Sequence, residues 1–384
     1  MMIYPSELTK KWTHHSLSDV VEFLDKKRKP ITQKDRVPGP YPYYGANGQQ
    51  DSVADFIFDE PLILLAEDGG HFGDPTKTIA YQVEGKCWVN NHAHVLRPKE
   101  NINIRYLCRH LERYDITSFI TGSTRGKLTK SSASIIPIAL PTLEEQRRIA
   151  AILDKADAVR RKRKQAIALT EDLLRSAFLD MFGDPVTNPK GWKRGFIADI
   201  AQIVTDGTHH TPERSDEGIY LLSARNIQEG YIDISGGVDF IPVSEFERLS
   251  KRYNPNQHDV LISCSGSVGR VTVVRDFPTF SIVRSVAAIR TKPDLLKPEF
   301  LESLLHTPYM KSMMKRGSKQ SSQANLFQGA IKELPVIIPP ISIQENWEKQ
   351  KKKIRNLSSS LTDMKNVHDN LFNSLLQRAF RGEL

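Results

Sequence analysis

Two polar, basic loops contain the residues best suited to contact a phosphate-rich polymer. They span residues 121–130 and 316–325, and each places glycine beside lysine or arginine. Glycine lets a phosphate approach the backbone, lysine and arginine neutralise its charge, and glutamine can form two hydrogen bonds with the edge of adenine. We therefore predict that both loops face DNA. Their candidate contacts are Arg125, Lys127, Lys319, Gln320 and Gln323.

The motifs that would carry catalysis are incomplete. Residues 122–128 resemble a nucleotide-binding loop, but the glycine spacing is one residue short and leucine follows the lysine where serine or threonine is needed. The glycine pattern of a methyl-donor site and the Asn-Pro-Pro-aromatic tetrapeptide of amino-methyltransferases are both missing. We expect no catalytic residue in this chain and, if methylation is involved, a separate chain that performs it.

Two sets of residues keep a metal-dependent alternative open. Asp74, Glu84 and Lys86 have a spacing that a metal-dependent nuclease could use, but proline follows Asp74 instead of preceding it, and Glu84 belongs to a predicted turn. Five cysteines and histidines could be imagined as zinc ligands, but their spacing matches no standard pattern. We predict no metal site. The five residues are Cys87, His92, His94, Cys108 and His110.

The composition is that of a folded, basic protein. Hydrophobic residues make up 39% of the chain, and 54 Lys and Arg against 45 Asp and Glu give a net charge of +9. Such a field favours polyanions. Three scattered cysteines are too few for a disulfide framework. Because no apolar run approaches the roughly 20 residues of a membrane span and the first residues lack a signal-peptide core, we expect a cytoplasmic protein without membrane association.

The sequence repeats itself in the same order in its two halves, which must be recognised before any fold is assigned. A Trp-x4-[Leu/Ile]-x-Asp pattern begins at Trp12 and again at Trp192. Three further matches follow, so an internal duplication is predicted. They pair residues 63–73 with 260–269, residues 136–146 with 334–344, and residues 173–178 with 375–380.

Each half ends in a long stretch without glycine or proline, in which apolar residues recur at alternating steps of three and four. Two such helices most simply bury their stripes against each other as an antiparallel pair. The offset between the halves grows from 198 at Gln146 and Gln344 to 202 at Phe178 and Phe380, which predicts a second helix longer by four residues. The predicted interface residues are Ile149, Ile152, Val159, Leu173, Ile354, Leu357, Leu361, Met364, Leu371 and Leu375.

These elements predict an α+β fold of two mixed domains separated by two long helices, related by a pseudo-twofold repeat. Strands are expected at residues 62–66, 260–263 and 271–274, and in the proline-bracketed segments that lead into the helices. The expected segments are a first domain at 1–140, a first long helix at 141–182, a second domain at 183–340 and a second long helix at 341–384.

The proline-bracketed strand, the glutamine-containing long helix and its Leu-Leu-x-x-Ala-Phe end together resemble the specificity subunits of type I restriction-modification systems. The resemblance covers essentially the whole chain. Residues 140–149 are close to the family's Pro-Pro-Leu-x-Glu-Gln segment, whereas the second copy has Ile343 in place of the acidic residue before Gln344. Residues 206–212 and 264–269 also resemble stretches of the family's target recognition domains. In the second half, further candidate DNA contacts are Thr208, His209, His210, Arg225 and Asn226.

The resemblance implies a non-catalytic, DNA-binding protein in which each domain reads one half of a bipartite double-stranded target. It also implies assembly with two modification subunits, which would use S-adenosylmethionine, and with restriction subunits that would use ATP and magnesium; this chain itself would hold no cofactor. Two alternatives stay open, namely a stand-alone nuclease and a coiled-coil scaffold that does not read DNA. The target sequence does not follow from the residues, because base readout depends on loop geometry.

Overall fold

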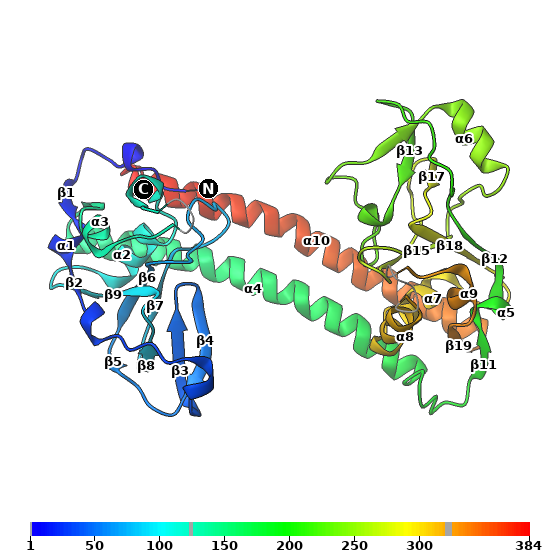
Figure 1. Cartoon of the computed structure of the whole chain (residues 1–384), viewed down its shortest axis with the longest axis horizontal. Helices are drawn as coiled ribbons and strands as arrows, with labels where there is room; N and C mark the ends of the chain where they lie inside the picture. The colour runs from blue at the N-terminus through cyan, green and yellow to red at the C-terminus, as the bar shows by residue number, and fades with distance from the viewer. Residues whose placement is uncertain (1, 123–125, 319–324) are drawn as a thin grey trace. The chain divides into compact units, whose positions relative to one another are not determined.

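The computed structural model describes residues 2–122, 126–318 and 325–384, and the chain divides into two compact units (Figure 1). The first unit comprises Met1–Gln165 and Leu361–Leu384, and the second comprises Ala166–Ser360. This division differs from the four consecutive segments predicted from the sequence. The reason is that each domain packs on part of both long helices, so that each unit takes one half of each helix.

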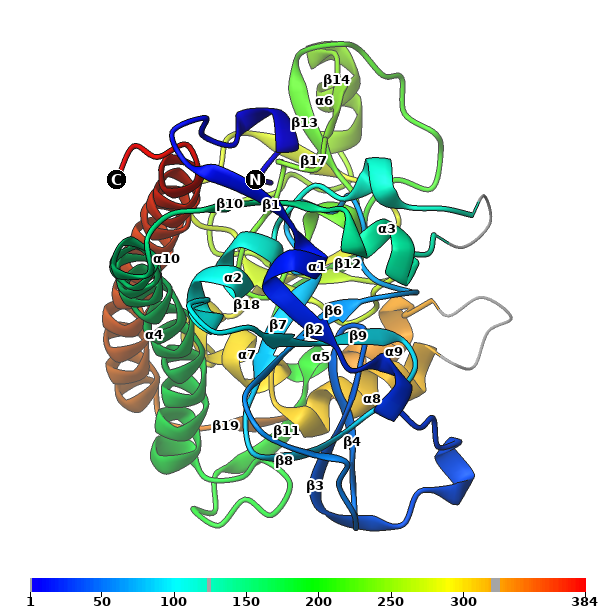
Figure 2. The same ribbon diagram turned by 90° about the vertical axis from the view of Figure 1, so that its left-hand side faces the viewer.

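The first unit is built on a four-stranded antiparallel sheet in the order β2-β9-β6-β7, with a second sheet in the order β4-β3-β8-β5 (Figure 2). Its strands are β1 (Thr13–Ser16), β2 (Val21–Phe23), β3 (Pro38–Gly45), β4 (Gly48–Val53), β5 (Phe58–Asp59), β6 (Leu62–Ala66), β7 (Ala80–Val83), β8 (Lys86–Val89), β9 (Ala93–Pro98) and β10 (Pro137–Leu140). Its helices are α1 (Leu17–Val20), α2 (Ile104–Leu111) and α3 (Lys130–Ser134), with short 3₁₀ turns η1 (Pro5–Glu7), η2 (Asp25–Lys27), η3 (Gln33–Asp35) and η4 (Thr117–Phe119).

The second unit repeats the four-stranded sheet in the order β12-β18-β15-β16 and adds a three-stranded sheet in the order β14-β13-β17. Its strands are β11 (Lys193–Phe196), β12 (Ala201–Asp206), β13 (Ile219–Leu222), β14 (Asp239–Ile241), β15 (Val260–Ser263), β16 (Val271–Val273), β17 (Phe280–Ile282), β18 (Val286–Thr291) and β19 (Pro335–Ile338). Its helices are α5 (Ile197–Ile200), η5 (Ala224–Asn226), α6 (Val243–Ser250), α7 (Pro298–Leu305), α8 (Pro308–Ser318) and α9 (Gln328–Lys332). The predicted α+β class and the internal duplication are thus confirmed.

The two central sheets share one register. Leu96 lies opposite Ile63 in the first sheet, and Ile289 lies opposite Val260 in the second, as the sequence repeat requires. The strand on the other side follows the same rule, because Phe23 pairs with Leu96 and Val204 pairs with Ile289. The residue of the second unit that is equivalent to a given residue of the first can therefore be found by counting along the strands from these pairs.

A buried glutamine fastens each long helix to its domain. In the first unit the side chain of Gln146 accepts a hydrogen bond from the backbone N–H of Asn103 (2.8 Å) and donates to the carbonyl of Pro141 (3.0 Å). In the second, Gln344 accepts from the N–H of Lys297 (2.8 Å) and donates to the carbonyl of the proline five residues before it (2.7 Å). Both side chains are sealed from solvent, so the matching position of these glutamines in the sequence corresponds to a matching role.

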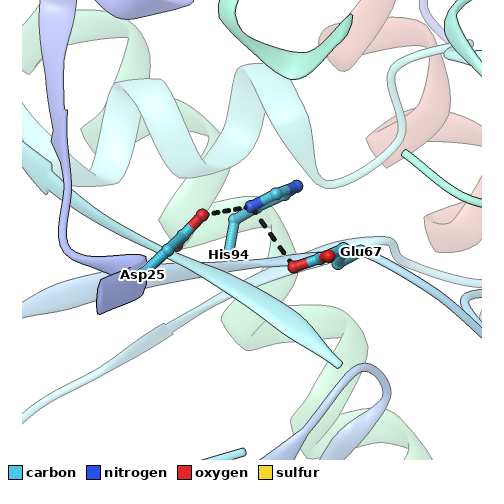
Figure 3. A group of neighbouring side chains, drawn as sticks. All are labelled: Asp25, Glu67 and His94. Atoms are coloured by element: carbon cyan, nitrogen blue, oxygen red, sulfur yellow. Dashed lines mark hydrogen bonds and ion pairs between the residues drawn. The ribbon is translucent and has the colours of Figure 1, made fainter. Parts of the chain in front are cut away.

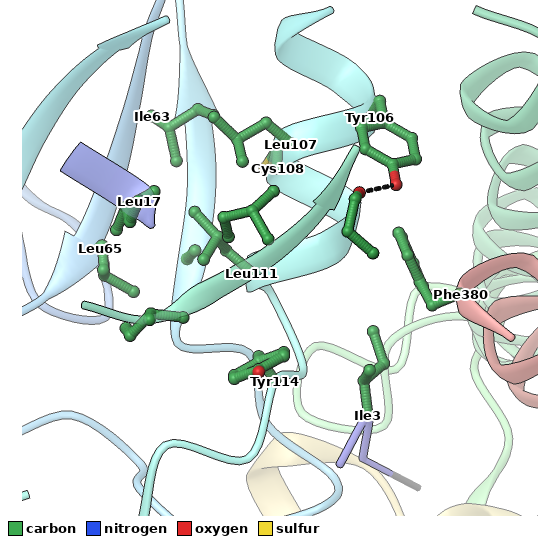
Figure 4. Packing of buried hydrophobic residues seen from close by; sticks show 14 of the residues in the cluster. Ile3, Leu17, Ile63, Leu65, Tyr106, Leu107, Cys108, Leu111, Tyr114 and Phe380 are labelled. Carbon is green, nitrogen blue, oxygen red and sulfur yellow. Dashed lines mark hydrogen bonds between the residues drawn. The ribbon is translucent and has the colours of Figure 1, made fainter. Parts of the chain in front are cut away.

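The long helices α4 (Leu143–Phe182) and α10 (Ile341–Phe380) join the cores of both units. In the first unit, Ile149 of α4 and Phe380 of α10 share a cluster with Tyr106 and Leu111 of α2, and the Tyr106 hydroxyl donates to the carbonyl of Ala139 at 2.5 Å (Figure 4). In the second unit, the rings of Phe178 and Phe182 from α4 pack around Trp347 of α10 and Phe300 of α7.

The residues of the predicted heptad interface differ in their burial. Ile149 is buried and Leu375 packs at the edge of the first core, while Ile152, Ile354 and Leu361 are half-buried. The other predicted positions are between 41% and 51% exposed. In the first unit the domain packs against a different stripe of the two helices, which carries Leu153, Phe372, Leu376 and Ala379. The exposed positions are Val159, Leu173, Leu357, Met364 and Leu371.

The predicted difference in helix length is also wrong. Both α4 and α10 contain 40 residues. The sequence landmark Phe178 lies four residues before the end of α4, whereas its counterpart Phe380 is the last residue of α10. The extra turn in α4 carries Phe182, which is buried in the second core, so the shift in offset reflects where the helix ends relative to the landmark.

Candidate nucleic-acid interface

The two predicted DNA-facing loops end at equivalent points of the fold. Leu128, near the end of the first loop, donates its N–H to the carbonyl of Glu67 after β6 at 2.7 Å. Leu326, which follows the second loop, donates to the carbonyl of Cys264 after β15 at 2.9 Å. Because β6 and β15 are equivalent strands, the matched position inferred from the sequence is reproduced where each loop returns to its sheet.

Most residues proposed in these loops lie outside the described part of the chain. Lys127 is described: its backbone pairs with that of Thr121, and its half-exposed side chain forms an ion pair with Glu67 at 3.1 Å. Because its side chain remains half exposed, Lys127 stays a candidate for DNA contact. Outside the described residues lie Arg125, Lys319, Gln320 and Gln323.

Beneath the first loop is a network of charged side chains that the sequence analysis did not identify. The Nδ1 atom of His94 on β9 lies 2.6 Å from a carboxylate oxygen of Asp25 and 3.6 Å from one of Glu67 (Figure 3). Its Nε2 atom lies 2.9 Å from the carbonyl of Leu128, at the end of the loop. Burial would raise the pKa of Asp25, but the interactions with His94, the N–H of Val95 and Arg28 together lower that pKa. The network therefore ties the end of the loop to the central sheet.

The same three side chains have the composition of a metal-binding group, with ligand atoms within 4.8 Å of one another. Cations of the protein already neutralise their carboxylates, however. Arg28 contacts Glu67 at 2.6 Å and Asp25 at 3.5 Å, and Lys127 adds a second contact to Glu67. A divalent cation would have to displace or face these positive groups. We interpret the cluster as an internally neutralised ion network.

The second unit has a different polar cluster in the equivalent place. Asp206 ends β12 at the position that corresponds to Asp25, as counted from the strand pairs. Its carboxylate accepts a hydrogen bond from Arg252 at 2.9 Å, lies 2.9 Å from Nε2 of His209, and also accepts a bond from the amide of Gln328. His209 and Arg252 are more than half exposed. Asp206 thus holds two solvent-facing groups that can be cationic.

The turn that contains Thr208 and His210 lies beside an arginine that the sequence analysis did not single out. The N–H of Thr208 donates to the carbonyl of Ile282 (3.2 Å), and the N–H of Arg284 donates to the carbonyl of Thr208 (3.1 Å). The Thr208 hydroxyl donates to the carbonyl of the exposed His210. The Arg284 side chain is exposed and forms no ion pair with the described residues. Its signal in the sequence was weak, because a lone arginine in a turn is common.

The neighbouring candidates Arg225 and Asn226 differ in their exposure to solvent. Arg225 is half exposed and forms an ion pair with Asp239 at 2.8 Å, so it keeps a surface position. Asn226 is only 1% exposed, and its side chain accepts from Ser223 and donates to the carbonyls of Asp233 and Gly237. The predicted DNA contact at Asn226 is therefore wrong, because its hydrogen-bonding groups are used to hold the loop.

The residues of the nuclease alternative have local partners instead of a shared site. Asp74 accepts hydrogen bonds from the backbone and hydroxyl of Thr76, and Glu84 accepts one from Gln82. Lys86 lies over the ring of Phe56. Among the described residues, the metal-like cluster at His94 is the single group of its kind, and it contains none of these. The cysteines are buried in the cores. No described helix has both the length and the apolar character that a membrane crossing requires.

Similarity to known proteins extends over most of the chain. A chain of Haemophilus influenzae provisionally named a type I restriction enzyme specificity subunit is 27% identical over 365 residues, covering 90% of this chain and 88% of its own length. The EcoKI specificity subunit of Escherichia coli K12 is 23% identical over 349 residues, covering 84% of this chain and 74% of its own.

Solved structures show the same fold. The crystal structure of a type I restriction-modification S subunit from M. genitalium matches with a TM-score of 0.63 at 15% identity, covering 96% of each chain. A chain from a structural study of complex assembly and conformational transition in the type I R-M system matches with a TM-score of 0.53 at 17% identity, covering 98% of this chain and 99% of its own. The model of the type I restriction modification DNA specificity domain matches residues 9–169 and again 189–363, so this chain belongs to that family and carries the domain twice.

Proposed function

We propose that each unit reads one half of a bipartite DNA target and that the long helices set the distance between the halves. The observation that carries this proposal is that the domain occurs twice. Both copies have the same four-stranded sheet, the same buried glutamine contacts and the same backbone contact between loop and sheet, while the polar side chains beside the loops differ. Two different surfaces on one scaffold suit two different half-targets. Arg225, Arg252 and Arg284 supply positive groups in the second unit.

The catalytic steps belong, in this proposal, to other chains. Two modification subunits would bind S-adenosylmethionine and methylate adenine, and restriction subunits would use ATP and magnesium to cut DNA. The exposed apolar side chains on the long helices support a docking role, because large apolar groups left in water often mark contacts with partners. These side chains include Val159, Leu173, Leu357, Met364 and Leu371.

The proposal is tested by reconstituting the chain with its host's modification subunits and mapping the methylated adenines. We expect a motif of two short specified blocks separated by a fixed unspecified gap. Lys319→Ala should weaken binding to all sequences alike and lower the salt slope by about one unit, whereas Gln320→Ala should relax one base position at a cost of about 1–3 kcal/mol. An uninterrupted motif, or no sequence preference, would contradict the proposal.

The spacing role has its own test. Four residues are removed from each long helix, near residues 160–164 and 358–361, which shortens each by about 6 Å. Since B-DNA rises about 3.4 Å per base pair, the gap should change by one or two base pairs while both half-targets stay the same. An unchanged gap in a folded, active assembly would show that the helices do not set it.

A further inference from the structure

Each domain docks on the long helix that follows it through a buried ion network, and the two networks have opposite polarity. In the first unit the domain supplies the cation and the helix supplies the anions. In the second unit the domain supplies the anions and the helix supplies the cations. The sequence repeat, which matches apolar and backbone features, gives no hint of this inversion.

The first network is centred on Arg109 of α2. Its guanidinium contacts Asp154 of α4 at 2.8 Å, Asp157 of α4 at 3.0 Å and Glu112 at 3.0 Å. The Asp157 side chain is 5% exposed and also contacts Arg160 at 2.7 Å. Burial would raise the pKa of Asp157, but the neighbouring guanidinium groups, Arg109 first, lower it. The Asp157 carboxylate thus faces Arg109 in its charged form.

The second network is centred on Glu302 of α7, which is fully buried. Its carboxylate contacts Lys351 of α10 at 2.5 Å and Arg355 of α10 at 3.4 Å, and it also receives Arg275 from its own domain at 2.6 Å. Lys351 makes a further contact with Glu299 at 3.0 Å. Burial opposes ionisation of Glu302, but Lys351 and Arg275 prevail and lower its pKa.

The networks occupy equivalent places. α2 and α7 both contain eight residues, and the residue before each donates its N–H to the fastening glutamine. Counted from those glutamines, Asp157 and Arg355 are both the eleventh residue along the long helix. Counted along α2 and α7, Glu302 corresponds to Cys108, one residue before Arg109. One helical position therefore carries an anion in the first unit and a cation in the second.

We propose that this opposite polarity restricts each recognition domain to its own long helix, so that a domain moved to the other position docks only if the helix charges are exchanged with it. The glutamine fastening cannot make this distinction, because it uses the same groups in both units. The ion networks can, since a domain helix bearing Arg109 would face Lys351 and Arg355, and one bearing Glu302 would face Asp154 and Asp157. A buried charge without a partner, or against a like charge, is strongly unfavourable.

The first experiment compares Glu with Gln at position 109, because the two side chains have nearly the same shape. Each is introduced into the full chain with native Asp157 and into the chain with Asp157→Arg. Hydrogen exchange of α2 reports docking, and α7 in the same molecule is the control. With Asp157, Arg109→Glu should leave α2 less protected than Arg109→Gln; with Arg at 157 the order should reverse, each time by about tenfold or more in the opening equilibrium.

Equal protection of the Glu and Gln variants, or the same order in both backgrounds, would overturn the proposal. Loss of all protection in all four variants would overturn it as well, because Glu at 109 opposite Arg at 157 should restore docking. The readout involves no DNA, so its failure is distinguishable from a failure of the proposed recognition function.

A second experiment copies the network of the second unit into the first. The domain side is changed by Cys108→Glu with Arg109→Ser, and the helix side by Leu153→Lys with Asp157→Arg, which reproduces the residues at the matching positions of α7 and α10. Each side alone should lower the protection of α2 at least tenfold, and the two together should regain most of it. If α2 in the variant with all four substitutions is no better protected than in the less protected of the two single-side variants, packing and not charge determines which domain docks on which helix.

Discussion

Asp25 and Asp206 occupy equivalent positions counted along the strands β2 and β12, yet their surroundings differ. Asp25 is held by the buried ring of His94, beside an ion network that the unit neutralises internally. Asp206 is held by the exposed His209 and Arg252 and by Gln328. The glutamine fastenings, by contrast, are nearly identical. The glutamine contacts that fasten a domain to its helix are retained in both units, whereas the contacts beside the loops have diverged.

Removal of the fastening glutamines should have the largest effect and should be equal in the two units. Gln146→Ala or Gln344→Ala leaves a backbone N–H and at least one carbonyl without a partner inside a core. We expect a loss of about 2–4 kcal/mol in the local free energy of unfolding, measured by hydrogen exchange of α2 or α7. A large loss in one unit with none in the other would show that the two fastenings are not equivalent.

Lowering the pH should destabilise the first unit more than the second, because of His110. This ring is buried, accepts the N–H of Ala139 at 3.4 Å and stacks on Tyr114, whereas the matching residue of α7 is Leu304. Burial first, and His14 second, lower the pKa of His110 to about 3. The folded unit therefore keeps a neutral ring, while the unfolded chain binds a proton below about pH 6.5.

The stability contributed by the neutral ring is fully present above pH 6.5 and is lost as the pH falls from there toward 3. Between pH 7 and pH 5 the first unit should lose about 2 kcal/mol that the second does not lose from this cause. The measurement is hydrogen exchange of α2 and α7 at both pH values, corrected for intrinsic rates. His110→Leu should abolish the difference; a difference that persists in this variant would assign it to another group.

Arg284 provides a test of whether the exposed cations beside the loops of the second unit contact DNA. If its exposed side chain neutralises one phosphate, Arg284→Ala should weaken binding severalfold for all sequences and lower the slope of log affinity against log salt by about one. Arg225→Ala provides the control, because that arginine already has Asp239 as a partner and should change the slope less. Filter binding or anisotropy with the reconstituted complex at several salt concentrations measures both. An unchanged slope for Arg284→Ala would remove it from the interface.

The smallest effect on the chain itself is expected on the exposed stripe of the long helices. Leu371→Ser and Leu357→Ser alter side chains that are both 51% exposed, so the free energy of unfolding should change by no more than about 0.5 kcal/mol. Assembly with modification subunits should weaken in both variants if this stripe is the docking surface. Phe372→Ala, at a buried neighbour, should instead destabilise the first unit by several kcal/mol.

The sequence alone determined the duplication, the α+β class, the two long helices and the matching places of the two loops before the proline-bracketed strands, because each of these depends on local spacing. Periodicity, proline brackets and Gln146 with Gln344 carry that information within short stretches. DNA recognition was likewise suggested by the whole pattern of motifs. The individual contacts were less secure, as Asn226 shows by turning inward to hold its own loop.

Only the tertiary structure decided which stripe of each long helix is buried, and which charges meet across the buried contacts. Heptad spacing identified apolar residues, but the domains compete for the helix surface, so that Phe372 is buried while Leu371 remains in water. The pairing of Arg109 with Asp157, and of Glu302 with Lys351, joins residues almost fifty positions apart. Its energy depends on burial and on distances of a few ångströms, which no spacing along the chain specifies.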